Sequence, residues 1–215
     1  MVHDDEPITY IETHAGRGVY DLKSVEAVKT GEAKLGIERA LKNKEIPDDH
    51  PYVQLVAATK ARYGASWYPG SPSIARQLLR EQDMLHLFEL HPQEHAALRA
   101  LIRAKNIRIN HKDGYSGAMA FAKSGAGRAL VLIDPSYEVK SEYDQAAEFI
   151  IKLHAKWPKA SILLWYPILE AGLHEGMIAQ LSAAGISNPF HDEVLFAEGS
   201  GLRMKGSGLW GFSAQ

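Results

Sequence analysis

The chain has 215 residues, a formal net charge of −2 at pH 7 and no cysteine. The missing cysteines exclude disulfide bonds, thiolate metal sites and cysteine nucleophiles, and they suit a reducing cytoplasm. The near-neutral charge excludes a bulk cationic surface, so any surface for nucleic acid would have to be a local patch. The N-terminus lacks a signal-peptide pattern and no apolar run approaches the roughly 18 residues of a membrane span, so we expect one cytoplasmic domain over residues 1–215.

The first expected strand is Ile8–Glu12, "ITYIE", which is rich in β-branched and aromatic residues and ends in the small-residue turn "THAGRG". Residues 31–65 then read as a helical insertion, interrupted by prolines. After the turn "YPGSP" another helix is expected, with Ser71 as its N-cap and Pro72 at its first position.

Strands and helices alternate through the rest of the chain. The expected strands are Leu85–Leu90, Ile107–His111, Ala129–Asp134 and Ser161–Ile168, and the expected helices are Gln93–Ala104, Ser116–Lys123, Tyr143–Lys156 and Glu170–Ala184. The final "DEVLFAE" and "GSGLWGFS" predict an antiparallel strand pair joined by a turn with Gly199 and Gly201. This alternation is typical of an α/β fold with a doubly wound, mostly parallel sheet, closed at one edge by the hairpin.

An acid or a glycine-rich turn follows nearly every expected strand, and the carboxyl ends of parallel strands form the ligand-binding edge. Gly16 lies in the first turn, and Glu89 ends the second strand, where an acid can accept both ribose hydroxyls of an adenosine. Glu89 follows Gly16 by 73 residues (89 − 16), whereas a dinucleotide fingerprint expects about 20. The fingerprint also lacks its third glycine, so an adenosine without a pyrophosphate fits better, and S-adenosylmethionine (SAM) is the common one.

Each of these residues also has an ordinary structural interpretation. Glu89 could be a surface acid, Asp113-Gly114 a common loop dipeptide, and His14 the cap of the following segment. The histidines show no tight metal-ligand spacing, so we expect no metal. The strongest local signal is Asp134-Pro135-Ser136-Tyr137, an acid, a proline and an aromatic residue at the tip of a buried strand.

Several blocks of the sequence together resemble a known family. They are "ETHAGRGVYDL", "WYPGSPSIARQLLREQDMLHLFELHP", the Asp113-Gly114 pair, "ALVLIDPSYE" and "LWYP". The chain resembles the class I SAM-dependent methyltransferases over nearly its whole length. Within them it is similar to the bacterial RlmJ family, which methylates the N6 amine of an adenine in large-subunit (23S) ribosomal RNA.

The resemblance implies roles for single residues. His14, Gly16 and Ser71 would contact SAM, Glu89 would hold the ribose hydroxyls, and Asp113 with Gly114 would lie at the adenine. Asp134 would be catalytic, at the first place of the family's Asp-Pro-Pro-Tyr motif. Two departures accompany the match: Ser136 replaces the second proline, and the chain lacks the family's His-x-Gly-Asn-x-x-Asp-x-x-Lys-His segment and its C-terminal end. We therefore expect a shortened member of this family. The property to test is whether such a chain can still close over SAM.

The residues at the tip also suggest a mechanism for an amine that is a poor nucleophile. Asp134 and the carbonyl of Pro135 can each accept a hydrogen bond from the amine, and Tyr137 can stack on the base. The base must be reached unstacked or flipped. Ser136 leaves both acceptors in place, so we predict that it is tolerated.

The expected partner is ribosomal RNA, with the protein acting as a monomer. Basic residues that could hold the RNA, or could equally belong to solvated helix faces, are Lys42, Lys44, Lys60, Arg62, Arg76, Arg80, Lys140 and Lys205. Three alternatives remain: methylation of DNA or of another amine, a non-catalytic nucleic-acid-binding relative linked to the use of external DNA, and a nucleotide-dependent oxidoreductase, which the missing glycine disfavours.

Overall fold

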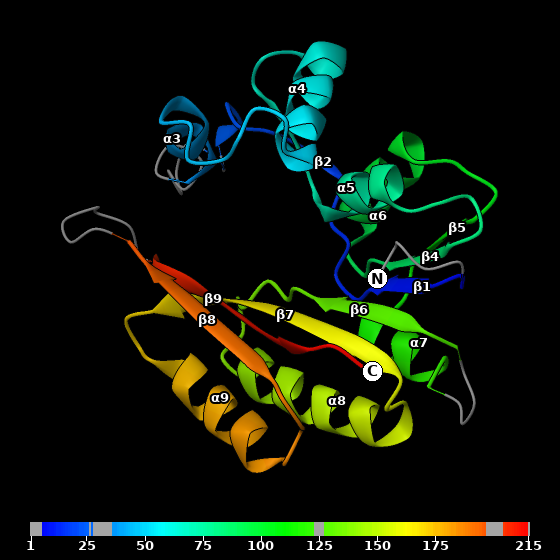
Figure 1. Ribbon diagram of the computed structural model, residues 1–215, viewed down its shortest axis with the longest axis vertical. Helices are drawn as coiled ribbons and strands as arrows, with labels where there is room; N and C mark the ends of the chain where they lie inside the picture. The colour runs from blue at the N-terminus through cyan, green and yellow to red at the C-terminus, as the bar shows by residue number, and fades with distance from the viewer. Residues whose placement is uncertain (1–5, 26, 28–35, 123–126, 197–203, 215) are drawn as a thin grey trace.

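A computed structural model describes residues 6–25, 27, 36–122, 127–196 and 204–214 (Figure 1). The strands are β1 (Thr9–Glu12), β2 (Val19–Asp21), β3 (Trp67–Pro69), β4 (Met84–Phe88), β5 (Ile107–Asn110), β6 (Ala129–Ile133), β7 (Ala160–Leu169), β8 (Phe190–Leu195) and β9 (Met204–Phe212). The helices are α3 (Ile37–Lys42), α4 (Pro51–Tyr63), α5 (Ser71–Leu78), α6 (Pro92–Leu101), α7 (Gly114–Met119), α8 (Glu142–Lys156) and α9 (Leu173–Ala183). In the described part of the chain, no helix is both long and apolar enough to cross a bilayer.

Seven strands form one sheet in the order β5-β4-β1-β6-β7-β9-β8. The pairs from β5 to β7 are parallel, and β9 lies antiparallel to both β7 and β8. The predicted mostly parallel sheet with a terminal antiparallel hairpin is therefore confirmed. The predicted hairpin glycines, Gly199 and Gly201, lie outside the described residues.

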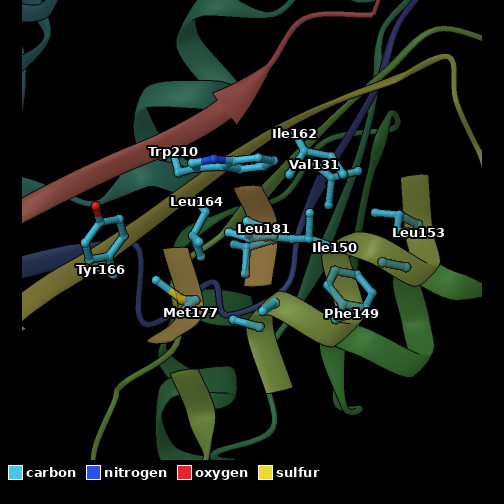
Figure 2. Close-up of a cluster of buried hydrophobic side chains, with 14 of the residues drawn as sticks. Val131, Phe149, Ile150, Leu153, Ile162, Leu164, Tyr166, Met177, Leu181 and Trp210 are labelled. Carbon is cyan, nitrogen blue, oxygen red and sulfur yellow. The ribbon is translucent and has the colours of Figure 1, made fainter. Parts of the chain in front are cut away.

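Helices cover both faces of the sheet, and each face has its own apolar core. On one face, α7, α8 and α9 pack against alternate residues of the central strands, including Val131 and Ile133 of β6. Figure 2 shows part of this core, with Trp210 of β9 above Ile150 of α8, and Tyr166 of β7 at the left beside Leu164. On the other face, α5 and α6 pack on residues such as Leu85 and Leu87 of β4. Because successive strand residues point to opposite faces, these continuous apolar strands are buried on both sides.

The segment between β1 and β4 contains more than the expected helices. α3 and α4 lie within the predicted insertion of residues 31–65, whose residues 31–35 are outside the described part. Beside them, β2 and β3 form a separate antiparallel pair that the sequence reading missed. Each strand has only three residues, too few to show a periodicity. Figure 1 shows α4 above α5, and both α3 and α4 on the side of the sheet away from α8 and α9.

Candidate active site

The carboxyl ends of the parallel strands surround a cavity of about 960 Å³. The parallel register brings these ends to one edge, since Glu12 of β1 lies opposite Leu87 of β4 and Leu132 of β6. The predicted residues that line the cavity are His14, Gly16, Glu89, Asp113, Gly114, Asp134 and Pro135. Ser71 and Tyr137 are not part of this wall.

Glu89 joins two of the strand ends to each other. Its Oε2 accepts a hydrogen bond from the Gly16 backbone N–H at 2.7 Å, and its Oε1 accepts one from the His91 N–H at 2.7 Å. Gly16 adopts φ +61°, in the left-handed region where glycine carries no steric cost. Each carboxylate oxygen keeps a second acceptor direction, so Glu89 can fix the turn and still face a ligand.

Asp113 and Gly114 begin α7 at the cavity wall. The Asp113 side chain accepts a hydrogen bond from the Ser116 N–H at 2.7 Å and so caps the helix. The backbone of Gly114 packs directly on β1, because a Cβ added there would lie 1.9 Å from the carbonyl oxygen of Thr13. The dipeptide is therefore the start of a helix and not an ordinary loop, and it also forms part of the wall.

His14 follows β1 in the cavity wall, and neighbouring side chains hold its ring. Its Nδ1 lies 2.8 Å from the Thr13 hydroxyl, and its ring meets Tyr115 edge-on, with centroids 5.1 Å apart. Burial lowers the pKa of His14. The imidazole is thus neutral near pH 7 and can exchange hydrogen bonds without adding a positive charge to the cavity.

Asp134 follows β6 and faces the cavity without a protein partner. In the described part of the chain, no donor hydrogen-bonds to its carboxylate, and burial raises its pKa to about 7. Pro135 beside it also lines the cavity, and it has a carbonyl but no N–H. Asp134 is half-buried, so its carboxylate is open to the cavity and is free to accept a hydrogen bond from a ligand there.

Tyr137 is not placed to stack on a base, contrary to the prediction. Its side chain is 6% exposed and belongs to the core, its hydroxyl donates to the Trp165 carbonyl at 2.9 Å, and its ring lies 4.4 Å from that of Tyr143. Its backbone adopts φ +55°, which is strained for a bulky residue. This left-handed turn directs the ring away from the cavity. Ser136 is exposed, and its hydroxyl lies 3.4 Å from both Glu142 oxygens.

Ser71 is not an N-cap, and it contacts a buried acid instead. The N-cap of α5 is Gly70, and Ser71 is the first helical residue. Its hydroxyl donates to Glu12, a fully buried carboxyl that also accepts from the Tyr10 hydroxyl at 3.1 Å. Burial raises the pKa of Glu12 to about 8, and the two hydrogen bonds oppose that rise. Glu12 was expected at the end of the first strand but without a role, although an acid at the end of an apolar strand was the available signal.

The cavity wall is strongly acidic. Its charged members are Glu89, Glu94, Asp113, Asp134, Glu138 and Glu142, and no lysine or arginine is among the described residues that line it. Glu94 is paired with Arg17, which lies 2.5 Å away outside this wall. Among the described residues, no group of three His, Cys, Asp or Glu side chains could hold a metal ion. The acidic lining favours a cationic ligand, and the sulfonium of SAM is a cation.

This arrangement, a mostly parallel seven-stranded sheet with an antiparallel hairpin at one edge, is the fold of the class I SAM-dependent methyltransferases. The same fold occurs in a SAM-dependent methyltransferase from Agrobacterium tumefaciens, with a TM-score of 0.55 and 11% identity over 99% of this chain and 57% of that one. The profile of the family described as ribosomal RNA large subunit methyltransferase D, RlmJ, matches residues 5–210. The chain belongs to the RlmJ family.

Two relatives illustrate the membership. The ribosomal RNA large subunit methyltransferase J of Escherichia coli K12 is 36% identical over 208 residues, which cover 95% of this chain and 74% of that protein. The crystal structure of protein LPL1258 from Legionella pneumophila has a TM-score of 0.85 and 32% identity, and the match covers 99% of this chain and 79% of that one.

Proposed function

We propose that this protein transfers the methyl group of SAM to the exocyclic N6 amine of an adenine in large-subunit ribosomal RNA, in the cytoplasm. The observation that carries the proposal is the Asp134 carboxylate, which faces the cavity with no donor from the described chain. Beside it, the carbonyl of Pro135 supplies a second acceptor. An exocyclic amine has two N–H donors, so this pair of acceptors matches the group that is to react.

The residues around the cavity divide the binding of SAM between them. We assign the ribose hydroxyls to Glu89, the adenine end to Asp113 and Gly114, and close backbone approach to Gly16 and His14. Ser71 donates a hydrogen bond to Glu12, the residue that precedes Thr13 of the wall, and we assign it a supporting role there. The bound cofactor supplies an electrophilic methyl group on a cationic sulfur, and the acidic wall favours that charge.

Asp134 has two tasks in this proposal. Before transfer, its carboxylate and the Pro135 carbonyl hold both amine N–H groups, so that the nitrogen lone pair points out of the ring plane toward the methyl donor. After transfer, a carboxylate with a pKa of about 7 can take the proton that the nitrogen releases. No metal is needed for either task.

The target base must leave its stack to reach this cavity. Tyr137 is buried, so stacking has to come from an aromatic residue of the wall. Trp165 lines the cavity and follows Leu164, the β7 partner of Ile133, so it lies on the strand beside Asp134. We assign Trp165 the stacking role that the sequence reading gave to Tyr137.

The test is tritium transfer from SAM to unmethylated large-subunit ribosomal RNA, with the methylated nucleoside identified by mass spectrometry. We expect N6-methyladenosine from the wild-type protein, and at least a hundredfold lower rate from Asp134→Ala. Asp192→Ala, which removes an exposed acid of β8, is the matched control and should keep the wild-type rate. Full activity of Asp134→Ala would refute the proposed mechanism, and methylation of DNA but not of RNA would refute the substrate.

A further inference from the structure

Two adjoining hollows lie on the surface of α4, α5, α6 and β5, separate from the active-site cavity. The first has a volume of about 770 Å³ and lies along α6 and β5, and the second has about 360 Å³ and lies between α4, α5 and the end of α6. Both have Ile102 in their walls, so the two hollows adjoin at the end of α6. Since β5 is an edge strand of the sheet, this surface runs along the border of the fold.

All the charged residues of this surface are arginines, apart from a histidine. The first hollow contains Arg99, Arg103 and Arg108, and the second contains Arg62 and Arg76, with no acid in either wall. We call these five residues the arginine surface. All five are exposed. The absence of acids is notable in a chain with 26 acidic and 24 basic residues.

Within the described part of the chain, the guanidinium groups of the arginine surface have no acidic partners. Across residues 6–25, 27, 36–122, 127–196 and 204–214, none of the five has a carboxylate within ion-pair distance, whereas Arg17 and Arg80 are paired with Glu94 and Asp83. Arg108 donates only to the backbone carbonyls of residues 105 and 107, at 2.7 and 3.2 Å. Unpaired arginines gathered on one surface repel one another and do not stabilise the fold. Such a cluster is typical of a surface that binds a polyanion.

Helix α6 connects the arginine surface to the active site. Pro92 and Glu94 near its start line the active-site cavity, and Arg99 lies five residues beyond Glu94 on the same helix. At 1.5 Å per residue, this separation is about 8 Å along the helix axis. Next to Arg99, the rings of His95 and His111 stack with centroids 4.6 Å apart. A bound strand of a few nucleotides can thus contact the arginine surface and also reach the active-site cavity.

The active-site cavity is lined by acids, whereas the arginine surface carries only positive charges. The acidic cavity favours a cationic cofactor and repels phosphates, so an RNA substrate must be held from outside that cavity. We propose that the arginine surface binds the sugar–phosphate backbone of the ribosomal RNA substrate and positions it while one adenine enters the acidic cavity. This inference rests on the proposed function, because it assumes RNA as the substrate. Arginine suits the role because its planar fork binds phosphate in a bidentate manner.

The test is binding of unmethylated, in vitro transcribed large-subunit ribosomal RNA to the full chain without SAM, measured by filter binding over a range of salt concentrations. Each phosphate contact contributes about 0.7 to the slope of log K against log salt for single-stranded RNA. For Arg99→Gln/Arg103→Gln/Arg108→Gln we expect a slope lower by about 2 and at least about tenfold weaker binding near 0.1 M salt. Arg62→Gln/Arg76→Gln should lower the slope by about 1.4.

The matched control removes three positive charges from α8 and its end, on the other face of the sheet: Lys152→Gln/Lys156→Gln/Lys159→Gln. We expect this control to bind RNA within twofold of the wild type, and all variants to bind SAM within twofold. Equal affinity and slope for the arginine and lysine triple variants would overturn the inference. If the arginine triple variant does not fold, Arg99→Gln/Arg103→Gln decides by the same comparison with Lys152→Gln/Lys156→Gln, and there we expect a slope lower by about 1.4.

The outcome separates this inference from the proposed function. If the wild type binds the RNA through these arginines but does not methylate it, the proposed reaction is refuted and the proposed binding surface is supported. If wild-type and triple-variant proteins methylate subsaturating RNA at equal rates, the binding surface fails and the reaction stands.

Discussion

Replacing Asp134 by asparagine keeps an oxygen acceptor at the end of β6 and removes the group that titrates. Burial raises the pKa of Asp134 to about 7, so in the free wild-type protein the carboxylate is about half ionised at pH 7 and about one tenth ionised at pH 6. We expect kcat/KM for RNA to fall about tenfold per pH unit below 7. The Asp134→Asn variant should be slower at pH 8, and its rate should not depend on this ionisation.

The same substitution has a calculable effect on stability. The unfolded chain ionises this carboxyl near pH 4 and the folded chain near pH 7, so the folded state binds more protons between these values and its stability falls as pH rises. At about 1.4 kcal/mol per pH unit, this loss of stability reaches a limit of about 4 kcal/mol above pH 7. A buried amide N–H without a partner costs about 1–3 kcal/mol at either pH. We therefore expect the stability of Asp134→Asn relative to the wild type to rise by about 4 kcal/mol from pH 4 to pH 8, so that the variant is about 2 kcal/mol less stable at pH 4 and about 2 kcal/mol more stable at pH 8.

Two measurements decide this prediction. Initial rates of tritium transfer between pH 5.5 and 8.5 give the rate profile, and thermal unfolding at pH 4 and pH 8 gives the stability difference. A bound sulfonium favours the ionised carboxylate, so kcat at saturating SAM should have its midpoint below that of kcat/KM. If Asp134→Asn shows the wild-type pH profile, or if its stability relative to the wild type is the same at both pH values, the assignment of the titration to Asp134 is wrong.

Three further substitutions test the wall and the core beneath it. Glu89→Gln places an NH₂ group against a backbone N–H, so we expect at least tenfold weaker SAM binding by calorimetry and a loss of about 1–3 kcal/mol in chemical unfolding; wild-type affinity would contradict the ribose assignment. Gly114→Ala sets a methyl group 1.9 Å from the Thr13 carbonyl oxygen and should prevent folding, whereas Gly176→Ala, with open space in α9, should raise the free energy of unfolding by up to about 1 kcal/mol; equal stabilities would refute the close contact. Tyr137→Phe loses only the hydroxyl bond, so we expect about 1 kcal/mol less stability and a methylation rate within threefold of the wild type; a loss of activity without a loss of stability would restore its proposed contact with the base.

The positions of Glu89 and Asp134 were predictable because topology alone decides them. Once strands and helices alternate, parallel pairing brings every strand end to one edge, whatever the exact boundaries. Tyr137 was not predictable in the same way, because the sign of a single φ angle decides whether its ring enters the cavity or the core. Ser71 has a good N-cap composition, and only the tertiary placement of Glu12 shows why its hydroxyl points elsewhere. The pairing of β2 with β3 depends on contacts across 46 residues (67 − 21), which no local pattern contains.

The acidic wall also affects what happens after each reaction. Methyl transfer leaves the sulfur of the cofactor as a neutral thioether, so the attraction between that sulfur and the surrounding carboxylates is lost at the moment of turnover. In the assignment proposed above, the contacts to the ribose and the adenine are the same for the spent and the fresh cofactor. The proposed cavity then distinguishes the two by the methyl group and its positive charge, and this preference limits product inhibition without a conformational change.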